Sequence, residues 1–247
     1  MLQILMYHRV GKGKHSNCLE TLKAHLQFLK KHYPTVLPGD QLSKETLNVC
    51  LSFDDALCDF YAYTYPLLCK YQIRALLAVP VKYILEKSHL PLEKRLAIPY
   101  YDCMKEKIYK EKAPFCTWEE IQEMASSGFV EMASHSYSHV PIIDDIPNLS
   151  QEVLQSKEIL QSHIPQKIST FIYPFGKIGQ KTHEFVQNHY TYSMRIGNAL
   201  NWDWKSPTSI LYRINADNLK DLSKLFTWKS YLKSYCKLLS NNLFKRC

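Results

Sequence analysis

Short apolar runs alternate with segments of helical periodicity along most of this sequence, and this alternation restricts the fold more than any other feature. The apolar runs cover residues 2–7, 48–53, 74–81, 129–133, 170–173, 190–195 and 208–214. The helical segments cover residues 19–33, 58–71, 117–128, 150–163 and 179–189. Strands that alternate with helices pair in parallel and carry the helices on the outside. The sequence therefore predicts an α/β barrel, open or closed, and 247 residues are enough for a single domain of that kind.

Two regions interrupt the alternation. Residues 82–116 mix charges, tyrosines and prolines, and we expect them to form an insertion over the barrel. Residues 217–247 are predicted to form a basic amphipathic C-terminal helix after a barrel of residues 1–216. Its apolar face would carry Leu222, Leu225, Phe226, Leu232, Tyr235, Leu239 and Leu243. Two interpretations stay open, because the pattern suits both a helix packed on the barrel and a helix in peripheral contact with a membrane.

Charge and cysteine placement narrow the classes of function. The net charge is +8, and residues 220–247 contribute +6 of it. No nucleic-acid-reading motif accompanies this basic segment, so we expect no nucleic-acid partner. The eight cysteines form no Cys-x-x-Cys pair, which favours free thiols.

The first residues lack the features of a signal peptide, and no apolar run is long enough to span a membrane. We therefore expect a cytoplasmic protein, with peripheral attachment to the inner membrane face if the C-terminal helix binds lipid.

Polar side chains follow four of the predicted strands, at the point where each strand ends. They are Tyr7-His8, Asp54-Asp55, the segment 134–139 with His135 and His139, and the segment Tyr173-Pro174-Phe175-Gly176. Each signal alone has an ordinary structural explanation: an aspartate pair caps helices, two histidines four apart are common, and Pro-Phe-Gly forms a turn. The carboxyl ends of the strands in a parallel barrel converge, however, and catalytic residues lie there.

Together these residues supply the parts of a metal-assisted hydrolase. Two imidazoles and one carboxylate suit a divalent metal with open coordination positions, with Zn²⁺ as the first choice and Co²⁺, Ni²⁺ or Fe²⁺ as alternatives. A second carboxylate, adjacent in sequence, supplies a base for a water molecule. Both aspartates can face one site because the backbone turns where a strand ends.

The motifs resemble those of a known family. Leu5-Met6-Tyr7-His8-Arg9-Val10, Leu51-Ser52-Phe53-Asp54-Asp55, Ser134 to His139 and Tyr173-Pro174-Phe175-Gly176 occur in the order seen in polysaccharide deacetylases, also called the NodB-homology group or carbohydrate esterase family four. The resemblance covers about residues 2–215. It implies a distorted (β/α)7 barrel, with Asp54 as the catalytic base and Asp55, His135 and His139 as metal ligands. It also implies that Tyr173, Pro174, Phe175 and Gly176 contact substrate, with a backbone amide near Phe175 stabilising the oxyanion.

The implied function is removal of an N-acetyl group from an amino-sugar-containing saccharide. In a cytoplasmic protein the substrate would be an acetylated saccharide such as a sugar nucleotide, or a lipid-linked glycan precursor. After attack on the acetyl carbonyl, the leaving amine must be protonated, since an amide anion is a poor leaving group.

Two positions depart from the family pattern. Many members carry an arginine two residues before the motif's proline, where this chain has Ile172, and many carry a late general-acid histidine, whereas no histidine follows His189. The candidate acids are Asp54 itself after protonation, a water molecule, and His8 as an accessory group, with Asp54 ranked first because one carboxyl can act twice.

Two other functions compete with a deacetylase. A catalytically weak or inactive barrel that binds carbohydrate or metal without turnover would explain the departures. A glycosidase using Asp54 and Asp55 is disfavoured, because adjacent carboxylates are poorly placed to flank a glycosidic bond from two sides.

Overall fold

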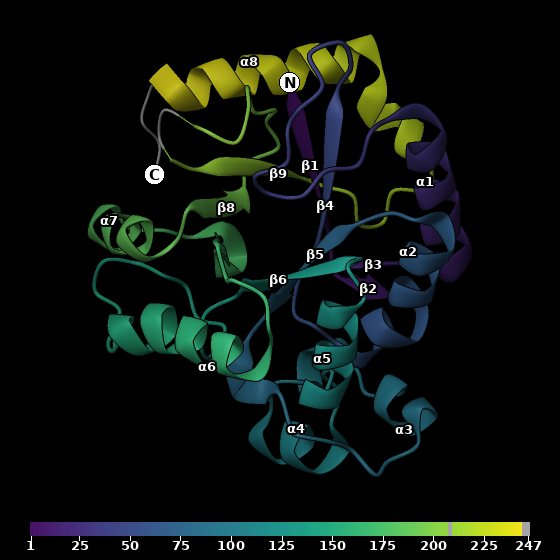
Figure 1. The fold of residues 1–247 in the computed structure, drawn as a ribbon, viewed down its shortest axis with the longest axis vertical. Coiled ribbons are helices and arrows are strands. Elements are labelled where there is room, and N and C mark those ends of the chain that lie inside the picture. The colour runs from purple at the N-terminus through teal and green to yellow at the C-terminus, as the bar shows by residue number, and fades with distance from the viewer. Residues whose placement is uncertain (207–208, 244–247) are drawn as a thin grey trace.

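The computed structural model describes residues 1–206 and 209–243. Within this part, seven parallel strands close into a barrel in the order β1-β4-β5-β6-β7-β8-β9 (Figure 1). Their bounds are β1 Leu2–Tyr7, β4 Asn48–Phe53, β5 Ala75–Val79, β6 Val130–Ser134, β7 Thr170–Ile172, β8 Tyr192–Ile196 and β9 Leu211–Asn215. The barrel closes where β1 pairs with β9. The expected distorted (β/α)7 barrel in a single domain is therefore confirmed.

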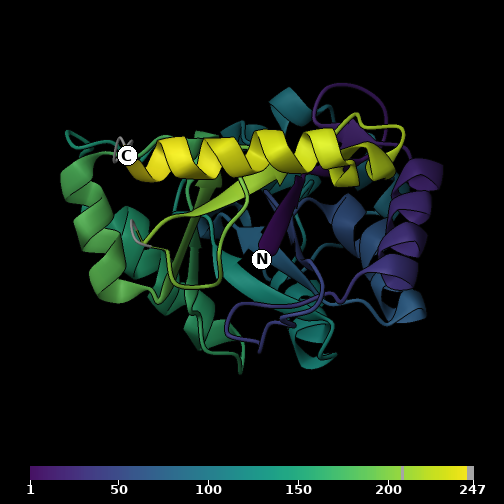
Figure 2. The ribbon, with the colours of Figure 1, turned by 90° about the horizontal axis from the view of Figure 1, so that it is seen from above.

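Helices cover the outside of the barrel, as the alternation predicts (Figures 1 and 2). They are α1 Leu19–His32, α2 Tyr65–Tyr71, α5 Trp118–Ser126, α6 Ser156–His163 and α7 Gln180–His189. A π-helical turn precedes α2 at Phe60–Thr64 and another precedes α6 at Gln151–Gln155. A short parallel ribbon of β2 Arg9–Val10 and β3 Ser16–Asn17 follows β1. The free cysteines of the described part include the buried Cys50, Cys58, Cys103 and Cys116.

Alternate residues of each strand face opposite sides of the barrel wall. One apolar cluster lies inside the barrel and contains Ile4, Cys50, Leu76, Ala133, Ile172 and Leu211. The other lies between strands and helices and contains Leu5, Leu51, Leu77, Met132 and Phe171 together with helix residues such as Leu26 and Leu160. Because the side-chain period of a strand is two, a residue two positions from Leu211 also points inward. This places Arg213, which is fully buried, inside the barrel.

The insertion carries short helical elements between β5 and α5. These are Val81–Tyr83, α3 Leu92–Leu96, Tyr100–Asp102 and α4 Glu106–Lys112. Arg95 fixes the insertion: its guanidinium pairs with Glu120 at 2.7 and 2.9 Å and donates to the carbonyls of Ala113 and Phe115, each at 2.8 Å. Glu120 also completes a capping box with Thr117 at the start of α5, where the sequence predicts that a helical segment begins.

The C-terminal segment begins its helix later than expected. Residues 217–221 are not helical, and a 3₁₀ turn at Leu222–Phe226 precedes α8 Trp228–Leu243. The delay has a structural cause, because the Asp217 carboxylate accepts hydrogen bonds from His8, near the other end of the chain, and the Asp221 carboxylate accepts one from the Ser223 amide. Residues 244–247 of the expected helix lie outside the described part, and a domain division after residue 216 stays a prediction. None of the described helices combines the length and the apolar character needed to cross a membrane.

Candidate metal centre

The four strand ends singled out in the sequence converge on one pocket of about 630 Å³. His8 follows β1, Asp54 follows β4, His135 and His139 follow β6, and Phe175 follows β7, and all five line this pocket. The carboxyl ends of the barrel strands therefore gather the polar residues in space, as expected for an α/β barrel.

A left-handed turn brings the two neighbouring aspartates to the same site. Asp54 and Asp55 directly follow β4, and Asp55 and Ala56 have φ of 73° and 51°. Such values are uncommon for residues other than glycine and mark a strained turn at a functional position. Both carboxylates are almost fully buried, with exposures of 4% and 1%.

Asp55, His135 and His139 form a compact set of potential ligand atoms. Asp55 Oδ1 lies 3.2 Å from His139 Nε2 and 3.6 Å from His135 Nε2. One ligand atom from each of the three residues falls within 4.8 Å of the others. These separations suit three atoms that share a single cation at coordination distances near 2 Å.

The surroundings of this set fit a divalent metal ion. Asp55 Oδ1 is buried and has no hydrogen-bond partner, whereas buried carboxylate oxygens are normally paired. His135 Nδ1 donates to the Ile172 carbonyl at 2.7 Å, which leaves Nε2 as an unprotonated lone pair facing Asp55. Burial lowers the pKa of His135 to about 4, so this imidazole is neutral near pH 7, as a metal ligand must be.

Tyr100, from the insertion, orients the carboxylate ligand. Its hydroxyl donates to Asp55 Oδ2 at 2.8 Å, so Oδ1 is the oxygen left to face the two histidines. Burial, together with the charge of Asp55, raises the pKa of Tyr100 well above its usual range, so the hydroxyl keeps its proton. The sequence alone does not single out Tyr100, because nothing in segment 82–116 indicates which tyrosine reaches the barrel mouth.

Arg213 holds the predicted base. Its guanidinium forms a bidentate pair with Asp54, at 2.6 Å to Oδ1 and 2.9 Å to Oδ2, and also donates to Ser52 Oγ at 3.1 Å. Burial raises the pKa of Asp54, but the charge and hydrogen bonds of Arg213, together with the nearby His135 and His8, outweigh this effect, and the net pKa lies below the usual range. The arginine absent at Ile172 is thus supplied from β9. An arginine within an otherwise apolar strand was the available signal.

His8 is paired with a second buried carboxylate, Asp217. The His8 amide donates to Asp217 Oδ1 at 3.1 Å, and His8 Nδ1 lies 2.6 Å from Oδ2. The other ring nitrogen, Nε2, lies 3.8 Å from Asp54 Oδ2. Burial opposes the charged form of His8, but the bond to Asp217 and the nearby charge of Asp54 raise its pKa to about 9. His8 therefore carries a proton into the pocket near pH 7.

The segment Tyr173-Pro174-Phe175-Gly176 contributes mainly through Phe175. The Phe175 ring is 58% exposed in the pocket wall and lies 4.7 Å from the His139 ring, between centroids. Phe175 and Gly176 have φ of 58° and 63°, and a Cβ on Gly176 would come within 3.2 Å of Ile196 Cβ. The turn therefore favours glycine at this point.

The side chain of Tyr173 does not reach the predicted site. It is fully buried in the layer between strands and helices, where its hydroxyl lies 2.7 Å from His183 Nδ1. Tyr173 immediately follows Ile172, whose side chain points into the barrel, so the period of the strand turns Tyr173 outward. Pro174 is buried as well. A side-chain contact of Tyr173 or Pro174 with substrate is thus not supported.

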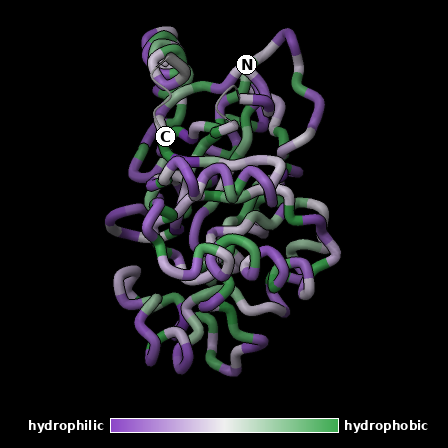
Figure 3. The backbone as a smooth tube through the Cα atoms, turned by 90° about the vertical axis from the view of Figure 1, so that its left-hand side faces the viewer, coloured by the Kyte–Doolittle hydropathy of each residue, from purple (hydrophilic) through white to green (hydrophobic). Residues whose placement is uncertain are grey.

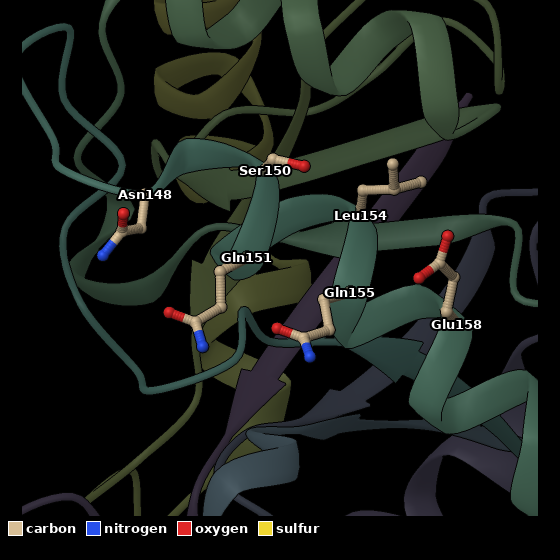
Figure 4. A pocket seen from close by; sticks show the side chains of 6 residues that line it. All are labelled: Asn148, Ser150, Gln151, Leu154, Gln155 and Glu158. Carbon is tan, nitrogen blue, oxygen red and sulfur yellow. The ribbon is translucent and has the colours of Figure 1, made fainter.

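A second hollow, of about 550 Å³, lies on the surface around the start of α6 (Figure 4). Its lining consists of Asn148, Ser150, Gln151, Leu154, Gln155 and Glu158. It contains a single carboxylate and no histidine or cysteine, so it offers no set of side chains that could hold a metal ion or pair an acid with a base. The pocket at the strand ends is the chemically equipped site.

Comparison with known proteins relates the chain to deacetylases. A family model described as polysaccharide deacetylase matches residues 43–193, well over half of the sequence. The Bacillus subtilis (strain 168) protein named "Putative polysaccharide deacetylase YxkH" is 27% identical over 194 residues, which is 73% of this chain. The chain spans only 59% of that relative's length.

Solved structures share the fold at low sequence identity. A Streptococcus pyogenes deacetylase in complex with acetate is 19% identical with a TM-score of 0.70, covering 94% of this chain and 97% of its own. A de-N-acetylase from Aggregatibacter actinomycetemcomitans is 21% identical with a TM-score of 0.71, covering 91% and 98%. A polysaccharide deacetylase from Bacillus cereus is 16% identical with a TM-score of 0.72, covering 94% and 68%. At these identities the likeness shows the fold alone.

Proposed function

Since the chain belongs to the polysaccharide deacetylase family, we propose that it is a metal-dependent hydrolase that removes an N-acetyl group from an amino-sugar-containing saccharide or glycan precursor. The proposal rests on one observation, which is that the two adjacent aspartates have different partners. Asp55 faces two histidines with a buried oxygen that has no hydrogen-bond partner, while Asp54 is held separately by Arg213. One carboxylate is thus arranged to bind a cation and the other to accept a proton.

Asp55, His135 and His139 would hold the cation, with Zn²⁺ as the first choice and Co²⁺, Ni²⁺ or Fe²⁺ as alternatives. A cation bound there supplies a Lewis acid that lowers the pKa of a water molecule and polarises the acetyl carbonyl. The hydrogen bonds of Tyr100 to Asp55 and of His135 to the Ile172 carbonyl fix the ligand orientations beforehand.

Asp54 acts as the base that takes the proton of the attacking water. Arg213 keeps this carboxylate ionised and fixes the direction of its oxygens. The same pairing makes Asp54 a poor proton donor, because its pKa is lowered. This argues against the order of candidate acids that the sequence favoured, in which Asp54 came first.

His8 acts as the general acid in this proposal. Its Nε2 points toward Asp54 across the pocket, and Asp217 holds the opposite ring nitrogen. A protonated imidazole with an oriented carboxylate behind it is the usual arrangement for delivering a proton to a leaving amine. The charge that develops on the acetyl oxygen would be stabilised by the backbone N–H of Phe175.

Exposed aromatic rings at the pocket mouth suit a saccharide. Phe175 and Tyr101 are 58% and 70% exposed, and both line the pocket. Such rings can pack against the apolar faces of sugar rings while the sugar hydroxyls stay hydrated. A cytoplasmic location, and with it a sugar nucleotide or lipid-linked glycan precursor as the acetylated substrate, remains part of this proposal.

The proposal is tested by acetate release from the metal-loaded protein. Candidate substrates are acetylated sugar nucleotides, chito-oligosaccharides and O-acetylated sugars. Asp54→Asn should retain the metal and lose at least about a hundredfold in rate, because it removes the base. Asp145→Asn, on the exposed loop before α6, should leave the rate unchanged. If the metal-loaded protein releases no acetate from any of these substrates, the deacetylase proposal is replaced by the alternative of a barrel that binds carbohydrate or metal without turnover.

A further inference from the structure

The outer face of α8 carries apolar side chains that the described part of the chain leaves exposed. Trp228, Leu232 and Leu239 are 73%, 48% and 40% exposed. Their spacing of four and seven residues places them along one side of the helix. Trp202, 43% exposed, extends the patch, because its ring packs on Tyr235 with centroids 5.3 Å apart.

The opposite side of α8 attaches the helix to the barrel. Leu238 is buried in a cluster with Leu200 and Tyr212, and Ser234 is buried beside them. The Leu200 amide also donates to the Ser234 carbonyl at 3.3 Å. The helix is therefore held by its inner side, and its exposed outer apolar residues do not contribute to this attachment.

Lysines flank the exposed apolar residues. Lys229, Lys233 and Lys237 recur every four residues and so form a row beside Trp228 and Leu232. The helix contains no aspartate or glutamate. Figure 3 shows the resulting mixture of hydrophilic and hydrophobic residues around α8. An apolar strip bordered by lysines is the pattern of a helix that lies in a membrane interface.

We propose that the outer face of α8, formed by Trp228, Leu232, Leu239 and the lysines at 229, 233 and 237, docks the protein on an anionic lipid surface. Charge favours an anionic lipid surface over a second copy of the chain as the partner of this face. A symmetric dimer through this face would bring identical lysine rows together, and like charges oppose each other. An anionic bilayer instead accepts the apolar side chains and neutralises the lysines.

Docking through α8 turns the pocket away from the lipid. The cluster beneath α8 also includes Met1 and Leu47, which precede β1 and β4, whereas the pocket lies at the carboxyl ends of these strands. In Figure 1, α8 lies next to the N-terminus, and the insertion that carries Tyr100 lies at the other end of the molecule. The bound protein would therefore take its substrate from the aqueous side.

The test is vesicle sedimentation with the full chain. Vesicles containing phosphatidylglycerol should bind the protein about tenfold or more tightly than vesicles of phosphatidylcholine alone, and added salt should weaken that binding. The double variant Trp228→Ser/Leu232→Ser and the triple variant Lys229→Gln/Lys233→Gln/Lys237→Gln should each lose about tenfold in affinity.

Matched variants control for general effects of charge and apolarity. Lys94→Gln/Lys107→Gln/Lys112→Gln removes three exposed lysines from the insertion, and Ile143→Ser removes an apolar residue that is 46% exposed. Both should bind vesicles like the unchanged protein, and circular dichroism confirms the fold of each variant. The proposal is overturned if the protein binds neither kind of vesicle, or if the control variants lose as much affinity as the α8 variants. It is also overturned if light scattering finds a dimer that Trp228→Ser dissociates.

Discussion

The hydroxyl of a single tyrosine orients the proposed metal ligand Asp55. Tyr100→Phe keeps the ring and removes the hydrogen bond to Asp55 Oδ2. We expect metal affinity to fall about tenfold to a hundredfold, as for other partners of metal ligands. Competition with a chromophoric chelator measures the affinity without requiring activity. The neighbouring Tyr101→Phe, on a ring that is 70% exposed, is the matched control and should bind metal normally. Equal affinities for both variants would contradict the assigned role.

The protonation of His8 should set the alkaline limit of activity. An acid works in its protonated form, so with the pKa of His8 raised to about 9, kcat/KM should be level below that pH and fall above it. Asp217→Asn removes the charged partner of Nδ1 while keeping an acceptor for the His8 amide. The alkaline limb should then move to lower pH. A pH profile of kcat/KM in both proteins checks this, and an unmoved limb would assign the acid elsewhere.

At the scale of elements, the insertion depends on one buried ion pair. Arg95→Met leaves Glu120 without its partner and releases the carbonyls of Ala113 and Phe115. Removing one member of a buried pair typically costs about 3 kcal/mol of unfolding free energy. Denaturant titration measures that loss, and metal affinity should fall with it, because the insertion carries Tyr100.

A surface pair provides the comparison for Arg95. Arg74 pairs with Asp40, but its side chain is 41% exposed, so Arg74→Met should cost less than about 1 kcal/mol. Equal losses in the two variants would mean that burial of Arg95 does not determine its contribution.

The elements themselves were largely predictable from local patterns. The strands at 2–7 and 48–53 coincide with β1 and β4, and α5 begins at Trp118, at the start of the helical segment predicted from residue 117. Apolar periodicity and caps are local, so one sequence reveals them. The C-terminal helix was placed too early, at 217 instead of Trp228, because Asp217 is engaged by His8 from the other end of the chain.

At the scale of the whole molecule, the metal should add stability without being needed for the fold. The barrel has continuous apolar clusters on both sides of its wall, and these do not depend on the ligands. Binding at a hundred times the dissociation constant adds about 2.7 kcal/mol. For a domain of this size that corresponds to a rise in Tm of about 5–10 °C.

Thermal melts with metal and with chelator measure this shift. Asp55→Asn should melt at the same temperature under both conditions, because it weakens the site itself. Chelation should also abolish acetate release and leave the far-ultraviolet circular dichroism unchanged. Loss of the dichroism signal on chelation would instead make the metal a structural component.

The sequence by itself determined the identity and order of the candidate groups. Asp54-Asp55 and His135-x-x-x-His139 are contiguous motifs at strand ends, and parallel strands bring such ends together in any barrel. Tertiary structure decided how these groups are supported. Closure of the barrel pairs Ile4 of β1 with Arg213 of β9, and so places Arg213 on Asp54 and Asp217 on His8. The fold of the insertion places Tyr100 on Asp55. These partners lie far apart in sequence, and their contacts depend on the register and inward-facing side of all the strands at once, which no local pattern encodes.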